Sequence, residues 1–147
     1  MSGYRKILLA VDLSDDSEII GKRAVDMANR YQAEICLVHV VEYVPVEPMG
    51  EALLPSVQIE DELVKSAKTR FEALADILGL GEAPRYVEVG NIKAEVIRVA
   101  RDQECDLIVL GCRERHGLAI IINFTEDTML HAAPCDVLAV RLGQKDS

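Results

Sequence analysis

Five residues near the C-terminus could together hold a phosphate group. They are Gly111, Arg113, Arg115, Gly117 and Thr125. A glycine allows the backbone to approach an anion closely, and a guanidinium can donate two parallel hydrogen bonds to phosphate oxygens. A helix that begins after such a loop adds unpaired N–H groups and the positive end of its dipole. We interpret these residues as a candidate site for a nucleotide phosphate.

Glu114 weakens this candidate phosphate site. It lies between Arg113 and Arg115, where its carboxylate would repel a triphosphate. At an effective dielectric constant of about 20, two like charges separated by about 4 Å repel each other by about 4 kcal/mol. The flanking arginines can offset part of that repulsion. The loop is therefore predicted to be a degenerate phosphate site.

Cys112 offers a different chemistry in the same loop. A cysteine thiolate becomes more reactive where neighbouring cations lower its pKa, and Arg113 and Arg115 are such neighbours, although Glu114 opposes them. A thiol redox sensor that uses Cys112 is thus one alternative function. The other three cysteines lie in or beside apolar runs and are predicted to be reduced structural thiols; they are Cys36, Cys105 and Cys135.

Motifs of known catalytic machinery are absent from the sequence. It contains no GxSxG, no HExxH, no P-loop and no cysteine or histidine spacing typical of zinc sites. Of the three histidines, His39 falls in an apolar run and is predicted to be a structural histidine, whereas His116 lies in the candidate loop. We therefore expect no catalytic residues, no bound metal and no enzymatic activity.

Five apolar runs indicate β-strands that position this loop. Four of them are nearly unbroken by polar residues, as is typical of strands buried on both faces, and the third alternates in the way of an edge strand. The runs are residues 6–11, 34–41, 85–89, 106–111 and 136–142.

Helical patterns fill the gaps between these runs. Ser14 is a good N-cap for the first helix, and the others are predicted at about residues 59–80, from about 92, and at 118–132. Gly79 or Gly81 is expected to end the second helix. Residues 42–58 are rich in proline and are predicted to form a long variable loop, which could act as a lid or remain a solvated surface loop.

Alternating strands and helices predict an α/β fold, an open doubly wound five-stranded parallel sheet of order 3-2-1-4-5. Ligands bind such sheets beyond the carboxyl ends of the strands, where the strand order reverses. Val11, Asp12 and Val40 should border that crevice together with Gly111. Asp12 could contact a ribose or a base, or it could satisfy backbone N–H groups in the turn before the first helix.

Composition limits the classes of partner. The 147 residues suit a single domain over residues 1–147, and half of them are apolar. The net charge of −9 argues against binding to nucleic acid or to an anionic membrane surface. The N-terminal apolar run is too short for a signal peptide or a membrane span, which predicts a cytoplasmic protein.

Four segments, in order, resemble the universal stress protein family. They are KILLAVDLSDDSE, AEICLVHVVE, CDLIVLGCRERHGL and APCDVLAVR. The resemblance covers essentially the whole chain and implies a flavodoxin-like fold, similar to the adenine nucleotide alpha hydrolases, and a role in the stress response. It also implies a cytoplasmic homodimer paired through the last strand, with an interface of Val137, Leu138, Ala139, Val140 and Arg141. An apolar edge strand fits such pairing, because it is an aggregation hazard when left open.

The resemblance also bears on ATP. Family members that bind ATP carry glycine, two residues, a second glycine, nine residues, and then Gly-Ser or Gly-Thr. Gly111 matches the first glycine, but Glu114 replaces the second, and Phe124 or Asn123 replaces the third. The resemblance therefore implies a member that does not bind ATP in the family's usual manner. A nucleotide-responsive switch that holds AMP or ATP through Arg113, Arg115 and Thr125 remains the alternative.

Overall fold

The computed structural model describes residues 3–42, 53–113 and 132–142, and within these ranges the side chains of residues 53–59, 112 and 113 are not described. The strands are β1 (Lys6–Ala10), β2 (Glu34–Val41), β3 (Arg85–Val89), β4 (Leu107–Arg113) and β5 (Asp136–Leu142). The helices are α1 (Ser17–Tyr31), α2 (Leu53–Ile77) and α3 (Ile92–Asp102).

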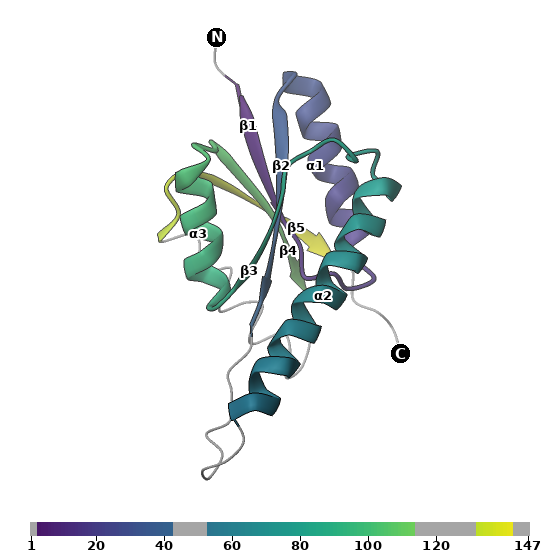
Figure 1. The fold of residues 1–147 in the computed structure, drawn as a ribbon. Helices are drawn as coiled ribbons and strands as arrows, with labels where there is room; N and C mark the ends of the chain where they lie inside the picture. The colour runs from purple at the N-terminus through teal and green to yellow at the C-terminus, as the bar shows by residue number, and fades with distance from the viewer. Residues whose placement is uncertain (1–2, 43–52, 114–131, 143–147) are drawn as a thin grey trace.

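The five strands form one parallel sheet in the order β3-β2-β1-β4-β5, which confirms the predicted fold class. Helices α1 and α2 cover one face and α3 covers the other (Figure 1). β1 lies at the centre, and its residues Ile7, Leu8 and Leu9 are completely buried. Their nearly continuous apolar sequence follows from burial on both faces. β3 is an edge strand, as its alternating pattern predicted.

Each face of the sheet has its own hydrophobic core. The larger one lies under α1 and α2 and includes Phe71, which is almost fully buried and is contributed by α2. The smaller one lies under α3, which contributes Val96, Val99 and Ala100. The two cores hold the sheet between two helical layers, so only its edges and strand ends remain for polar function.

α1 begins two residues later than the predicted N-cap at Ser14 implies. Asp16 occupies the N-cap position without a side-chain hydrogen bond to the helix, and the Ser17 N–H donates to the Ser14 carbonyl at 3.0 Å. The Ser14 hydroxyl instead accepts from the Asp16 N–H at 3.4 Å. Ser14 therefore belongs to a turn before the helix, and the prediction was wrong because local turn bonds outcompeted the cap.

α2 starts at Leu53 rather than near residue 59, so the helix takes up the last part of the predicted variable loop at 42–58. Pro55 lies in its first turn, where the missing proline N–H costs no helical hydrogen bond. The loop prediction at 53–58 was therefore wrong, and residues 43–52 lie outside the described residues. Gly79 follows the helix with φ of 72° and confirms the predicted glycine stop.

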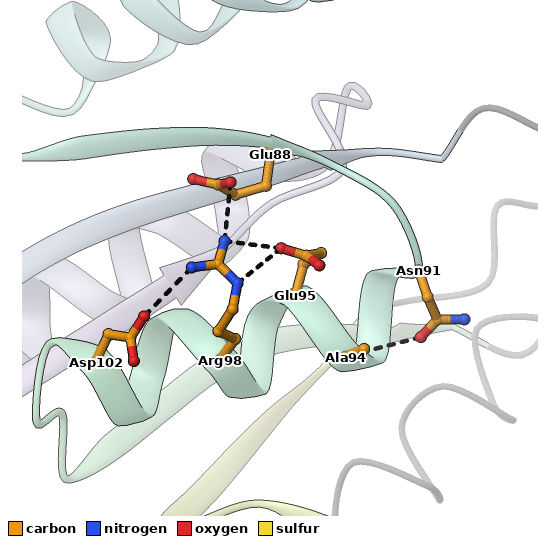
Figure 2. Close-up of polar contacts among 6 residues, drawn as sticks. All are labelled: Glu88, Asn91, Ala94, Glu95, Arg98 and Asp102. Carbon is orange, nitrogen blue, oxygen red and sulfur yellow. Dashed lines mark hydrogen bonds and ion pairs between the residues drawn. The ribbon is translucent and has the colours of Figure 1, made fainter.

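α3 is held against the edge strand by an ion-pair cluster around Arg98 (Figure 2). The guanidinium of Arg98 contacts the carboxylates of Glu88 at 2.8 Å, Glu95 at 2.7 Å and Asp102 at 3.3 Å. Only Glu88 belongs to β3, so this pair ties the helix to the sheet. Asn91 caps α3 by accepting the Ala94 N–H at 2.9 Å. The cluster lies at the surface, where such pairs contribute little to stability.

The remaining predicted helix, 118–132, lies outside the described residues except for Ala132. Within the described part of the chain, no helix is long and apolar enough to cross a membrane.

Candidate functional site

The strand order reverses between β1 and β4, and the polar groups that follow β1 form the candidate site. Val11 and Val40, predicted to border it, have buried side chains that belong to the cores on opposite faces of the sheet. The Val11 N–H donates to the Val38 carbonyl at 3.1 Å. Their side chains therefore pack within the protein, and a ligand would meet mainly backbone atoms there.

Asp12 has an exposed side chain that organises the turn between β1 and α1. Its Oδ1 atom accepts the Ser14 N–H at 3.0 Å and the Ser17 hydroxyl at 3.2 Å. Partial desolvation raises the pKa of Asp12, but these hydrogen bonds outweigh it and hold the pKa below its usual value. The structure thus brings Asp12 to the predicted place and shows the turn role directly.

Two further residues of this corner were missed from the sequence, Leu13 and Arg70. Leu13 has φ of 62°, a left-handed conformation that costs a non-glycine residue about 1–2 kcal/mol. Arg70, from α2, donates a hydrogen bond from Nη2 to the Leu13 carbonyl. No local signal pairs two residues that lie 57 positions apart. The turn where a ligand would approach is therefore marked by the strained backbone of Leu13 and by the hydrogen bond from the Arg70 side chain.

His39 is a structural residue of the same corner, as predicted. Its Nδ1 atom lies 2.9 Å from the Val11 carbonyl, and because a carbonyl only accepts, Nδ1 carries the proton. The ring packs edge-on against Phe71 with centroids 6.3 Å apart. This hydrogen bond fixes the imidazole to the end of β1, which favours a role in holding the turn over one as a catalytic base.

Gly111 packs closely against α1, and a side chain at this position would require Ile20 to move. A Cβ atom at this position would lie 2.4 Å from Cδ1 of Ile20 on α1 and 3.3 Å from Cδ1 of Leu142 on β5. Both contacts are tighter than normal van der Waals contact, so a larger residue would push α1 or its Ile20 side chain outward. Gly111 matches the first glycine of the phosphate-loop pattern, but its packing against Ile20 explains the glycine without any bound phosphate.

Cys112 and Arg113 lie in β4 rather than in the loop after it. They pair in register with Arg141 and Leu142 of β5, so the strand extends two residues beyond the predicted end. That prediction was wrong because the partner strand supplies hydrogen bonds which the local sequence does not reveal. The other residues discussed for the phosphate loop lie outside the described residues. They are Glu114, Arg115, His116, Gly117, Asn123, Phe124 and Thr125.

The predicted interface strand β5 is the second edge of the sheet. Among the described strands it pairs only with β4. Leu138 and Val140 pack into the core under α1, where Val140 is buried, whereas Val137 and Ala139 pack against the α3 side. Arg141 is exposed. The five residues thus share one strand, but Val140 belongs to the core.

Among the residues the structure describes, no three His, Cys, Asp or Glu side chains are placed to hold an ion together. The cysteines Cys36, Cys105 and Cys135 are free thiols, two of them buried, as expected of structural cysteines.

Comparison with known proteins identifies the family of this chain. The model of the universal stress protein family matches residues 3–141. The chain belongs to the universal stress protein family. Universal stress protein A homolog 2 of Coxiella burnetii is 35% identical over 144 residues, which cover 97% of this chain and 98% of the relative.

Solved structures of universal stress proteins share the fold. Universal stress protein UspA of Lactobacillus plantarum is 23% identical, with a TM-score of 0.81 over 96% of this chain and all of that one. A universal stress protein solved in complex with cAMP is 19% identical, with a TM-score of 0.62 over 95% of this chain and 98% of that one. At these identities the likeness concerns the fold alone.

Proposed function

We propose that this universal stress protein is a non-enzymatic stress-response protein of the A type, which acts as a cytoplasmic homodimer and does not hold ATP in the usual phosphate loop. The enclosure of Gly111 carries the proposal, because a Cβ atom there would meet Ile20 at 2.4 Å. Gly111 is the one glycine of the family's phosphate pattern that the sequence retains, and packing accounts for it. Glu114 and Phe124 then stand where close approach to phosphate requires glycine.

The test of nucleotide binding uses the freshly purified full chain. Bound nucleotide is sought after denaturation, and thermal unfolding is measured with and without millimolar MgATP. A ligand that binds only the folded state adds about 2.7 kcal/mol at a hundredfold excess over its Kd. We expect neither released nucleotide nor a shift in Tm. Stoichiometric ATP in the purified protein would reject the proposal.

A Glu114→Gly variant sharpens this test. Restoring glycine at the second position of the pattern removes a carboxylate from the neighbourhood of the triphosphate. If the loop is only weakened, this variant should gain a Tm shift in MgATP that the parent chain lacks. Glu114→Gln is the matched control, since it removes the charge and keeps the side chain. An equal gain in both variants would assign the effect to charge, whereas a gain in the glycine variant alone would assign it to backbone access.

The homodimer is supported by the position of β5 at the end of the strand order among the described strands, where its apolar residues would invite aggregation if left unpaired. Val137 is the residue to change, because it is half-buried, whereas Val140 lies in the core. We expect Val137→Asp to give a folded monomer by light scattering. Val89→Asp, on the exposed part of the opposite edge strand β3, is the control and should leave the dimer mass unchanged. An unchanged mass for Val137→Asp would reject this interface.

A second candidate function is a nucleotide-responsive switch that binds through the adenosine part. The solved relative with cAMP favours it, because cAMP carries no triphosphate. In this chain the exposed carboxylate of Asp12 stands after β1, independent of the phosphate loop. Tm shifts with adenosine, AMP and cAMP test it, with Asp12→Asn as the probe and Ser17→Ala as the control that keeps the carboxylate. Shifts that survive Asp12→Asn would remove Asp12 from the binding site.

A further inference from the structure

Two cysteines far apart in sequence meet inside the smaller core. Cys36 is the third residue of β2, and Cys105 lies in the turn between α3 and β4, 69 positions later. Their sulfur atoms are 3.6 Å apart, and the Cys36 sulfur lies 3.7 Å from the Ile7 carbonyl oxygen. Both are free thiols. They form the only sulfur–sulfur contact found among the described residues, and neither the family pattern nor the candidate nucleotide site uses them.

The surroundings of the pair are apolar and closed. Cys36 is completely buried and Cys105 is 7% exposed, and both pack with Leu8, Ala100 and Ile108. The hydrogen bond from Cys105 lowers the pKa of Cys36 against the opposing effect of burial, and the charge of Lys6 acts in the same direction. Because both thiols are enclosed, peroxide reaches Cys36 only when the turn that carries Cys105 moves aside. Cys105, next to Cys36 and nearer the surface, is in place to resolve an oxidised Cys36.

We propose that Cys36 and Cys105 form a dithiol site that hydrogen peroxide oxidises to an internal disulfide. The Cys36 thiolate attacks one peroxide oxygen, an S–O bond forms and the O–O bond breaks. The hydroxide that leaves takes up the proton lost by Cys36 and becomes water. The Cys105 sulfur then attacks the Cys36 sulfur, an S–S bond forms and the S–O bond breaks. The second hydroxide leaves with the Cys105 proton as water, so two thiols lose two electrons to one peroxide.

Formation of the disulfide requires only a limited movement of the two sulfur atoms. A disulfide has an S–S bond of about 2.05 Å, so the two sulfurs must approach by about 1.5 Å. Cys105 lies in a turn rather than inside a strand, and Glu104 beside it has φ of 56°, a strained conformation. The turn is thus the part of the pair that can adjust. The bond would tie β2 to the start of β4 and restrict the unfolded chain, which stabilises the folded state.

Cys135 is the matched control within the same region. It is half-buried before β5, and burial raises its pKa to about 11, so it remains a thiol. Cys112, the cysteine singled out from the sequence, lies in β4. Serine variants of these two residues should leave the proposed disulfide unchanged, whereas Cys36→Ser and Cys105→Ser should abolish it.

The experiment treats the full chain with hydrogen peroxide and then alkylates the remaining thiols under denaturing conditions. Mass spectrometry should show a mass lower by two hydrogens, two alkylated cysteines in place of four, and a Cys36–Cys105 cross-linked peptide within one chain. Dithiothreitol should restore all four sites. The peptide map of the unmodified sequence decides the matter even if a core variant does not fold. A map with no Cys36–Cys105 peptide, or with disulfides only through Cys112 or Cys135, would overturn the proposal.

Discussion

The two ends of the sheet use their polar side chains in different ways. At the amino ends of the strands, Asp106 accepts the backbone N–H groups of Arg5 and Lys6 at 2.9–3.2 Å, across about 100 positions of sequence. At the carboxyl ends, the bonds that Asp12 makes among the described residues are to Ser14 and Ser17, two and five positions away. One aspartate fixes two central strands to each other, and the other shapes a single turn.

This difference indicates how the fold separates stability from function. The long-range bonds of the amino end hold β1 beside β4. The carboxyl end carries the left-handed Leu13, whose carbonyl accepts a hydrogen bond from Arg70, at the place where ligands approach such sheets. The amino end therefore tolerates little change, whereas the carboxyl end can vary without loss of the fold.

Replacing Asp106 with alanine should produce the largest effect. The N–H groups of Arg5 and Lys6 would lose their acceptor, and we expect a loss of about 2–3 kcal/mol in the free energy of unfolding. Urea denaturation measures it. Asp106→Asn keeps an acceptor oxygen and should lose less than half as much. Equal losses of unfolding free energy for Asp106→Ala and Asp12→Ala would show that the two ends of the sheet do not differ in their contribution to stability.

Gly111→Ala tests whether packing explains the glycine at the carboxyl end. Its Cβ atom would lie 2.4 Å from Ile20, so we expect a destabilisation of about 1–2 kcal/mol, seen as a lower urea midpoint. Ile20→Val shortens the side chain that would be struck. The double variant should therefore be more stable than the sum of the two single losses predicts. Strict additivity would mean that the alanine harms the chain for another reason.

The charge of Asp12 should matter only where the residue is ionised. Its pKa is lowered in the folded state, because hydrogen bonds from Ser14 and Ser17 outweigh desolvation. A lowered pKa gives stability that is present above the ordinary aspartate pKa of about 3.9 and is lost as the pH falls through the folded-state value. Asp12→Asn should thus be less stable than the parent chain at pH 7, by well under about 1 kcal/mol because solvent screens the exposed carboxylate, and this difference should disappear as the pH falls below the folded-state pKa of Asp12. A gap that stays constant with pH would show that charge is not the cause.

The smallest effect is expected at the rim of the amino end. The Tyr4 hydroxyl donates to the Asp136 carboxylate at 2.8 Å on an exposed surface and links the segment before β1 to the start of β5. Tyr4→Phe keeps the edge-on packing against Tyr31, so only this hydrogen bond is lost. We expect a change of about 0.5 kcal/mol in the unfolding free energy. If Tyr4→Phe lost more unfolding free energy than Asp106→Ala, the contact with β5 rather than the contact with β4 would be the main stabilising link at this end.

The sequence by itself determined the fold class, the strand order and the place of the candidate site. Unbroken apolar runs separated by helical patterns leave few arrangements that bury every strand, and family motifs along the chain narrowed these to one. The alternating run at β3 also predicted its edge position correctly. Such features are readable because each depends on the local period of apolar residues.

Only the tertiary structure decided what the individual site residues do. Gly111 reads as a phosphate-loop glycine until Ile20 of α1 is seen beside it, and Cys112 reads as a loop residue until β5 pairs with it. The contact between Cys36 and Cys105 likewise could not be predicted from the sequence. These roles depend on contacts between residues far apart in sequence, and local pattern carries no record of which distant side chain will fill the neighbouring space.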